Sequence, residues 1–315
     1  MTEWTILGAG ALGCVVAGLL RRQGEPVSLL LSERHRGHLH PSLDMITLSG
    51  RHQLIHTRPC FAEQARQIRC LLVVTKAYQV VEALQGLHKL PESTPIILLH
   101  NGLGVAEQVQ ALYPHNPLIA GVSSHGAMKE GDWLVRHTGK GETWLGPINA
   151  AAAAHAHLVT PLAAALGHAQ WSEQILHRQH RKLAVNAVIN PLTSCNNIRN
   201  GQLLEPRFAD VLEQLSEEVH QVMLKLGEQE SLDDFRRRLH KVIELTATNY
   251  SSMHQDLTHG RRTEIDYITG YVINNANGLP VPVCRQLYRE IQRRSGKPPL
   301  RRERHTNKFV STLGA

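Results

Sequence analysis

The apolar positions in the first half of the chain form short, uninterrupted runs. Four runs lie at residues 4–7, 27–31, 71–75 and 96–99, and residues 117–123 and 142–146 are two further candidates. Short, continuously apolar segments are typical of parallel strands that are buried on both faces. Helical patterns lie between several of the runs, so this half of the chain predicts an α/β domain with a parallel sheet.

The pattern of the second half is different. An alanine-rich helical stretch at 150–156 and an alternating region that ends at Trp171 precede the change. Beyond about residue 173 we expect helices at 177–195, 207–229, 232–253, 263–277 and 283–294, and no strand. Strands with helices, followed by helices alone, indicate an α/β domain at 1–172 and an all-α domain at 173–295. Residues 296–315 then form a basic tail that we expect to be mobile.

Composition supports two folded domains. The 315 residues are 42% hydrophobic and 19% charged, which excludes a mostly disordered chain, and the length fits two domains. The net charge of +7 points to nucleic acid, a membrane surface or an anionic ligand. Part of this charge lies in the C-terminal tail, so we expect no nucleic-acid partner. The 20 histidines have no explanation from the pattern.

The cysteines predict neither a metal site nor a redox motif. The chain has five, an odd number, and none forms a C-x-x-C pair. No apolar run approaches the length of a membrane span, and no leader pattern opens the chain. We therefore expect reduced thiols, a cytoplasmic location and no membrane partner.

A glycine motif follows the first predicted strand and opens a helix. Its residues are Gly8, Ala9, Gly10, Ala11, Leu12 and Gly13, which match G-x-G-x-x-G. In this context the first glycine permits the tight turn, the second lets a pyrophosphate approach the backbone, and the third allows close helix–strand packing. The helix N-terminus then offers free N–H groups to the phosphates. The motif predicts a dinucleotide cofactor; a glycine-rich turn without a ligand is the alternative.

The end of the second predicted strand favours NADP over NAD. Ser32 is followed by Glu33, Arg34 and Arg36. A guanidinium pairs well with a 2′-phosphate, whereas an acidic side chain would bind the ribose 2′-hydroxyl and repel that phosphate. Glu33 lies 20 residues after Gly13, where such an acid is expected, so the NAD alternative depends on which way Glu33 points.

Polar side chains also follow two other predicted strands. Lys76 comes directly after the strand at 71–75, and Asn101 follows the strand at 96–99. Ligands of open parallel sheets bind beyond the carboxyl ends of the strands. We therefore expect Lys76 near cofactor phosphate or adenosine groups and Asn101 near the nicotinamide or a substrate. A loop role without a ligand is the alternative for each.

One predicted helix carries a polar stripe. Lys182, Asn186 and Asn190 are spaced i, i+4, i+8 and share a helix face, while the residues between them are apolar. An ammonium group buried without partners is costly and has a lowered pKa. The stripe therefore favours a helix that lines a cleft. In the alternative, Lys182 reaches solvent and the asparagines cap neighbouring elements.

A further polar segment has two interpretations. Ser251 and Ser252 lie at a helix end, and Thr263 precedes Glu264 and Asp266. These residues suit ligand binding. They also suit helix capping, with Thr263 as N-cap and the acids in the favourable first turn.

Together these segments resemble the 2-dehydropantoate 2-reductase (ketopantoate reductase) family. The resemblance covers about residues 4–295 in consistent order. It rests on residues 8–13, 76–79, 100–104, 181–186, 190–193, 251–256 and 263–267.

The resemblance implies a Rossmann-type domain and reduction of ketopantoate to (R)-pantoate by NADPH, in pantothenate and coenzyme A biosynthesis. It assigns the proton donor to Lys182. It assigns substrate binding to Asn101, Lys182, Asn186, Asn190, Asn200 and Ser252. It assigns cofactor binding to Gly8, Ala9, Gly10, Ala11, Leu12, Gly13, Arg34, Lys76, Asn101, Ala127 and Glu264.

The chain departs from the family pattern at Ser32, where an arginine is frequent and Arg34 is the expected replacement. Two other functions stay open at this stage. One is an NAD(P)-dependent reductase of another small 2-oxo acid, and the other is a non-catalytic NADP-sensing regulator. We expect a small anionic substrate and a monomer or homodimer.

Overall fold

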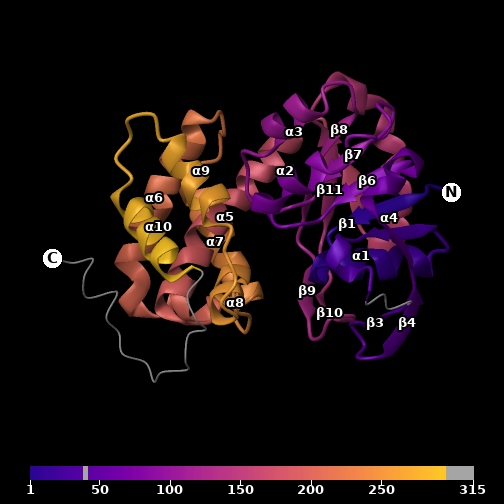
Figure 1. The fold of residues 1–315 in the computed structure, drawn as a ribbon. Helices are drawn as coiled ribbons and strands as arrows, with labels where there is room; N and C mark the ends of the chain where they lie inside the picture. The colour runs from indigo at the N-terminus through magenta and orange to yellow at the C-terminus, as the bar shows by residue number, and fades with distance from the viewer. Residues whose placement is uncertain (38–41, 296–315) are drawn as a thin grey trace. The chain divides into compact units, whose positions relative to one another are not determined.

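The computed structural model describes residues 1–37 and 42–295, and the contacts divide the chain into two compact units. The first is Met1–Gln179, and the second begins at His180. Figure 1 shows the first unit in indigo to magenta and the second in pink to yellow. Helix α5 (Ile175–Asn196) begins in the first unit and continues into the second. The expected domain boundary at 172 stays a prediction, as does the mobile tail, which lies outside the described residues.

The first unit contains an eight-stranded sheet with the order β12-β11-β8-β7-β6-β1-β2-β5. From β5 to β8 neighbouring strands are parallel, whereas β11 pairs with β8 in antiparallel fashion. The strands are β1 (Trp4–Leu7), β2 (Val27–Leu30), β5 (Arg58–Cys60), β6 (Cys70–Val73), β7 (Ile96–Leu98), β8 (Leu118–Ser123), β11 (Thr143–Pro147) and β12 (Ala169–Trp171). The α/β class predicted from the apolar runs is confirmed.

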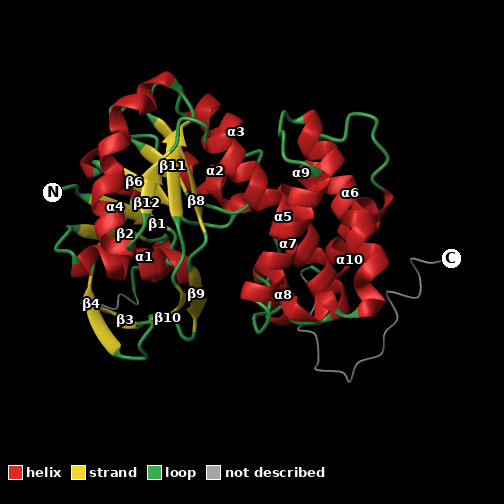
Figure 2. Cartoon of the chain, turned by 180° about the vertical axis from the view of Figure 1, so that it is seen from behind, coloured by secondary structure: helices red, strands yellow, loops and turns green. Residues whose placement is uncertain are grey.

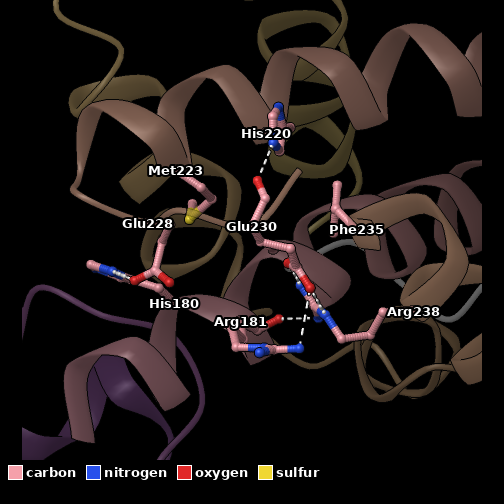
Figure 3. A pocket seen from close by; sticks show the side chains of 9 residues that line it. His180, Arg181, His220, Met223, Glu228, Glu230, Phe235 and Arg238 are labelled. Carbon is pink, nitrogen blue, oxygen red and sulfur yellow. Dashed lines mark hydrogen bonds and ion pairs between the residues drawn. The ribbon is translucent and has the colours of Figure 1, made fainter. Parts of the chain in front are cut away.

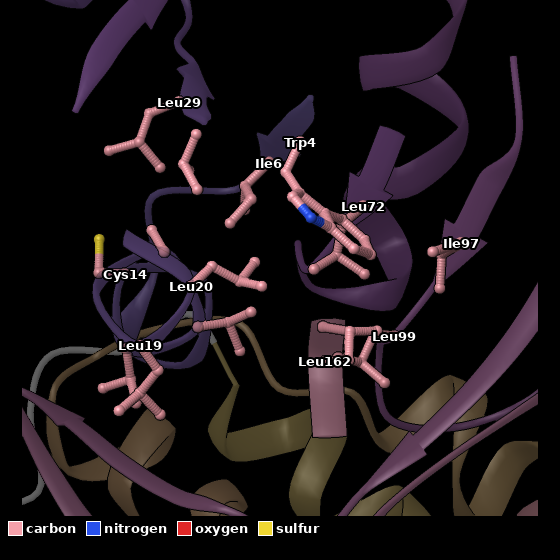
Figure 4. Close-up of a cluster of buried hydrophobic side chains, with 14 of the residues drawn as sticks. Trp4, Ile6, Cys14, Leu19, Leu20, Leu29, Leu72, Ile97, Leu99 and Leu162 are labelled. Carbon is pink, nitrogen blue, oxygen red and sulfur yellow. The ribbon is translucent and has the colours of Figure 1, made fainter. Parts of the chain in front are cut away.

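A second sheet, in the order β4-β3-β10-β9, was not expected from the pattern. Its strands are β3 (Ser42–Ile46), β4 (His52–His56), β9 (Gly126–Lys129) and β10 (Leu134–Gly139). Helix α1 (Ala11–Arg22) contacts strands of both sheets. Figure 4 shows the core it helps to form, which includes Leu19 and Leu20 of α1 together with Ile6, Leu29 and Leu162. This buried contact holds α1 against the strands of the first unit.

Further helices surround the sheets. They are η1 (Glu33–His35), η2 (Ala62–Gln67), α2 (Ala77–Gln85), α3 (Ala106–Leu112), η3 (Ala150–Leu158) and α4 (Val159–Leu166). The alanine-rich stretch is thus a 3₁₀-helix, η3, which leads directly into α4.

The regular elements of the second unit, within its described residues, are all helices, drawn red in Figure 2 and joined by green loops. Besides α5 it contains η4 (Asn200–Leu204), η5 (Pro206–Phe208), α6 (Ala209–Lys225), α7 (Leu232–Leu245), α8 (Ser252–Thr258), η6 (Ile265–Tyr267), α9 (Thr269–Asn274) and α10 (Pro282–Arg294). The all-α class is confirmed. Among the described helices, none combines the length and apolar character needed to cross a membrane.

Two helix predictions are wrong in their extent. The stretch 263–277 contains the separate helices η6 and α9 rather than one helix. The stretch 232–253 was expected to be a single helix, but α7 ends at Leu245 and α8 begins at Ser252. Ser251 causes the new start, because its hydroxyl accepts a hydrogen bond from the His254 N–H at 3.2 Å. A serine in this N-cap position stabilises the first turn of a new helix.

Candidate functional site

The sheet order brings four predicted segments to one edge of the first unit. Strands β2, β1, β6 and β7 are neighbours and parallel. Gly8 follows β1, Arg34 follows β2, Lys76 follows β6 and Asn101 follows β7. Their carboxyl ends lie at the same edge, which is the ligand-binding edge of an open α/β sheet.

The glycine turn leaves room for a ligand at one position only. Gly8 has φ +117°, and a Cβ on it would lie 2.9 Å from the Thr75 nitrogen. A Cβ on Gly13 would lie 2.0 Å from the Gly8 carbonyl oxygen. A Cβ on Gly10, by contrast, would meet none of the described atoms within 4 Å, and Gly10 is exposed at the start of α1. The turn therefore fits a phosphate group that approaches the backbone at Gly10.

The acid and the arginines after β2 have different partners. Arg36 pairs with Glu33 at 2.8 Å and with Glu63 at 2.5 Å, and it lies over the Phe61 ring. The hydrogen bond from Arg36 holds the pKa of Glu33 below its usual value. Arg34 is exposed and has no ion pair among the described residues. Its guanidinium is thus the one after β2 that is open to a phosphate.

Lys76 and Asn101 lie in the segments that join a strand to the helix that follows it. Lys76 is the N-cap residue of α2 and is half-buried. Asn101 is also half-buried, and Gly102 and Gly104 after it have φ of +79° and +93°. Positive φ values let the backbone turn sharply away from the sheet edge.

Ala127 lies in the small sheet rather than in the large one. It pairs with His137 across β9 and β10, and β9 contacts α1. Next to it, His125 Nδ1 lies 3.2 Å from His137 Nε2, and both side chains are buried. Burial lowers the pKa of His125 to about 4. The pair is therefore neutral at physiological pH and joins the end of β8 to β10.

The polar stripe predicted for α5 forms in the second unit. Lys182 and Asn186 are half-buried and Asn190 is buried, while the apolar residues between them are buried too. Burial lowers the pKa of Lys182 from 10.5 to about 8, and the negative charge of Glu264 partly opposes this change. Glu264 is itself 4% exposed. The stripe thus contains an ammonium group that can give up its proton near neutral pH.

The capping interpretation of the 263–266 segment is wrong in its details. Glu264, not Thr263, stands at the N-cap position of η6, and its side chain makes no capping hydrogen bond. The Thr263 hydroxyl is buried without a partner among the described residues. Asp266 accepts from the Tyr288 hydroxyl at 2.8 Å. The negative charge of the Glu264 carboxylate raises the pKa of Lys182.

Asn200 and Ser252 each begin a short helix. Ser252 is exposed as the first residue of α8. Asn200 begins η4 and is 7% exposed, and its amide nitrogen donates to the Thr246 hydroxyl at 2.9 Å. Its side-chain oxygen is buried and has no hydrogen-bond partner in the described part of the chain. Such an acceptor is costly unless a ligand or water satisfies it.

A pocket beside the start of α5 contains none of the predicted site residues. Figure 3 shows its charged groups paired with one another. His180 bonds Glu228 at 2.9 Å, and Glu230 accepts from Arg181 at 3.1 Å and from Arg238 at 2.9 Å. These side chains are hydrogen-bonded to one another. We therefore interpret them as a structural network that links α5 to the residues that follow α6.

Comparisons with known proteins agree with this arrangement. A family model described as "Ketopantoate reductase PanE/ApbA" matches residues 4–150, and one described as "Ketopantoate reductase PanE/ApbA C terminal" matches residues 174–295. A 2-dehydropantoate 2-reductase from Vibrio cholerae is 37% identical over 294 residues, which covers 91% of this chain and 96% of the relative.

Two solved structures have the same fold. A PanE/ApbA family ketopantoate reductase from Ralstonia eutropha superposes with a TM-score of 0.83 at 25% identity, covering 93% of this chain and 98% of the other. A D-mandelate dehydrogenase in complex with NADH and anilino(oxo)acetate superposes with a TM-score of 0.86 at 22% identity and the same coverage. By its sequence and its two matched regions, the chain belongs to the ketopantoate reductase family.

Proposed function

We propose that this protein reduces the C2 ketone of 2-dehydropantoate to (R)-pantoate with NADPH, in the synthesis of pantothenate and coenzyme A. The observation that carries the proposal is the α5 stripe, in which Lys182 has a pKa of about 8 beside Glu264. Ketone reduction needs a proton donor of this kind, and the family assignment supplies the substrate class.

The residues at the β1–α1 turn fit the cofactor. The open position at Gly10 and the free N–H groups at the start of α1 would hold the pyrophosphate. Lys76 would contact cofactor phosphate, Asn101 and Glu264 would lie toward the nicotinamide end, and the Ala127 backbone would make a further contact. When bound, NADPH supplies the hydride that reduces the ketone carbon.

Arg34 supports the preference for NADPH over NADH. Its exposed guanidinium suits a 2′-phosphate, whereas Arg36 is held by two carboxylates and by Phe61. The acid expected to select NAD is Glu33, and its carboxylate is engaged by Arg36. The carboxylate that made NAD an alternative is therefore held in an ion pair.

Lys182 acts as the general acid in this mechanism. Negative charge develops on the ketone oxygen as the carbon is reduced, and the Lys182 ammonium stabilises that charge and transfers its proton to the oxygen. Glu264 keeps a larger fraction of Lys182 protonated, because its carboxylate opposes the effect of burial on the pKa.

Neutral groups hold the rest of the substrate. The amides of Asn186 and Asn190 and the Ser252 hydroxyl can donate to the substrate carboxylate, and the Asn200 oxygen can accept from a substrate hydroxyl. None of these groups competes with Lys182 as an acid. Holding the substrate in one orientation supplies the proximity that the reaction requires.

The thiols support a cytoplasmic location. All five cysteines are buried and unpaired in disulfides. Free thiols persist in a reducing compartment. We propose a soluble enzyme there, as a monomer or a homodimer, with a small anionic substrate as its partner.

The test is NADPH oxidation by the purified protein with ketopantoate, repeated with NADH and with a panel of other small 2-oxo acids. Activity confined to another 2-oxo acid would replace the proposed substrate, and absence of any turnover would favour a cofactor-sensing regulator. Lys182→Ala should lower kcat by at least about 100-fold and leave NADPH binding nearly intact. An unchanged kcat would remove Lys182 from its role.

A further inference from the structure

The segment that carries Ser252 is hydrogen-bonded at three residues to the end of α5 and to the residues that follow it. We call residues 249–254 the Ser252 segment. The Ser251 hydroxyl lies 2.8 Å from the Thr193 hydroxyl, and His254 Nε2 lies 2.7 Å from Asn197 Oδ1. The Asn200 N–H donates to the Asn249 carbonyl at 2.9 Å. These bonds connect residues that are distant along the chain.

The hydroxyl contact has a defined direction. Thr193 Oγ1 lies 2.7 Å from the Ile189 carbonyl and 3.2 Å from the Asn190 carbonyl, so its single hydrogen points to the α5 backbone. With the Thr193 hydrogen used in this way, the Ser251 hydroxyl donates to Thr193 Oγ1 and accepts from the His254 N–H. The chain of bonds runs from the first turn of α8 to the backbone around Asn190. Thr193 is fully buried and Ser251 is 5% exposed, so water does not compete for these groups.

The second link uses an unusual backbone position. Asn197 follows the last residue of α5 and has φ +53°, in the left-handed region. Its side-chain oxygen accepts from His254 Nε2, and the ring of His254 stacks on Tyr250 at 4.4 Å. Tyr250 in turn lies under the Arg199 guanidinium, which donates to the Thr248 carbonyl. The links thus hold both sides of Ser252.

We propose that Thr193 and Asn197 are positioning residues that fix the Ser252 hydroxyl relative to the polar stripe of α5. They act through Ser251 and His254 and do not themselves contact substrate. The inference rests on the proposed function, because Ser252 matters only if it binds the substrate.

The first test compares Thr193→Val with Thr193→Ser. Valine keeps the shape and loses the hydroxyl, whereas serine keeps the hydroxyl. We expect Thr193→Val to raise the KM for ketopantoate about five- to tenfold, the effect of one lost hydrogen bond, with the KM for NADPH unchanged. Thr193→Ser should stay close to the original protein.

A double-mutant cycle separates positioning from general stability. In a Ser252→Ala background, Thr193→Val should produce little further change in the KM for ketopantoate, since the group it positions is gone. An equal effect of Thr193→Val in both backgrounds would overturn the proposal. A KM that does not respond to Thr193→Val at all would also overturn it.

The second link has its own matched pair. Asn197→Gly retains the left-handed backbone but removes the side-chain acceptor, and Asn197→Asp retains the acceptor. The proposal expects the KM for ketopantoate to increase in the glycine variant. The increase should be smaller in the aspartate variant. The opposite order would contradict it.

Amide hydrogen exchange gives a readout that needs no substrate. Faster exchange confined to residues 249–254 in Thr193→Val, with Thr193→Ser as control, is the expected result. Unchanged exchange overturns the positioning role even if ketopantoate is not the substrate. If exchange changes but ketopantoate is not reduced, the proposed function has failed and the KM comparison is made with whichever 2-oxo acid the protein reduces.

Discussion

Lys182 is subject to two opposing influences. Burial on α5 lowers its pKa, and the Glu264 carboxylate raises it again, so that the pKa is about 8. A general acid works best when its pKa lies near the operating pH. The balance between these two effects therefore suits a proton donor better than either effect alone.

The pH dependence of the reaction follows from this balance. The acid must be protonated, so kcat/KM should fall as the pH rises through about 8. Glu264→Gln removes the charge that raises the pKa and should move the fall to lower pH. Initial rates between pH 6 and 10, with Glu264→Asp as the charge-retaining control, measure this shift. A fall at unchanged or higher pH in the glutamine variant would contradict the proposed pairing.

Cofactor choice is also decided by single side chains. Arg34→Ala should weaken NADPH binding about tenfold and change NADH binding less than about twofold, because only NADPH carries the 2′-phosphate. Arg51→Ala, an exposed arginine in the turn between β3 and β4, is the control for charge alone. Fluorescence titration with both cofactors is the measurement. Equal weakening of both would place the 2′-phosphate site elsewhere.

At the scale of the element, different glycines of the β1–α1 turn serve folding and cofactor binding. Gly13 packs against the Gly8 carbonyl, and Gly10 faces open space. Gly13→Ala should destabilise the first unit by about 3 kcal/mol, because backbone must shift. The Gly10→Ala variant should have the same melting temperature as the original protein and bind NADPH about tenfold or more weakly. Thermal unfolding and cofactor titration of both variants test this; similar unfolding of the two would contradict it.

The predicted elements show which patterns the sequence carries clearly. Continuously apolar runs predicted six strands of the large sheet but not its edge strands β5 and β12, and periodicity predicted most helices. The small sheet was missed for a physical reason. In β10 the inward positions are Val135 and His137, and in β4 only Ile55 is buried. A histidine counts as polar in a sequence pattern even when its side chain faces inward. The alternation of apolar and polar residues that predicts a strand is therefore absent from β10.

Buried histidines account for part of the unexplained histidine content. His125, His137, His180, His220 and His254 are all buried. Each has a hydrogen bond to another side chain or to a backbone carbonyl. No local pattern predicts such partners, since His180 and Glu228 are 48 residues apart. For the same reason the sequence alone could place Lys182 on a polar stripe but could not pair it electrostatically with Glu264.

At the scale of the whole molecule, the net charge is concentrated at one end of the chain. Residues 296–315 contain five Lys or Arg and one Glu, so they hold four of the seven net positive charges. The remaining charge is close to that of an ordinary enzyme, and it includes Lys182 and Arg34 at the proposed sites.

Removal of residues 296–315 should therefore change kcat/KM for ketopantoate by less than about twofold. Steady-state rates of the shortened and full chains, at low and high ionic strength, measure the effect. A large loss of turnover at all salt concentrations would instead assign the tail to the enzyme's active machinery.

The buried cysteines allow the opening of each unit to be measured by the reactivity of native thiols. Burial raises the pKa of the Cys14 thiol to about 11 and that of Cys195 to about 12, and the remaining thiols also have raised pKa values. A thiol-reactive dye can modify them only after local or global opening. Cys14, Cys60 and Cys70 belong to the first unit, and Cys195 and Cys284 to the second. Labelling with the dye followed by peptide mass mapping would thus time the opening of each unit separately, without any introduced cysteine.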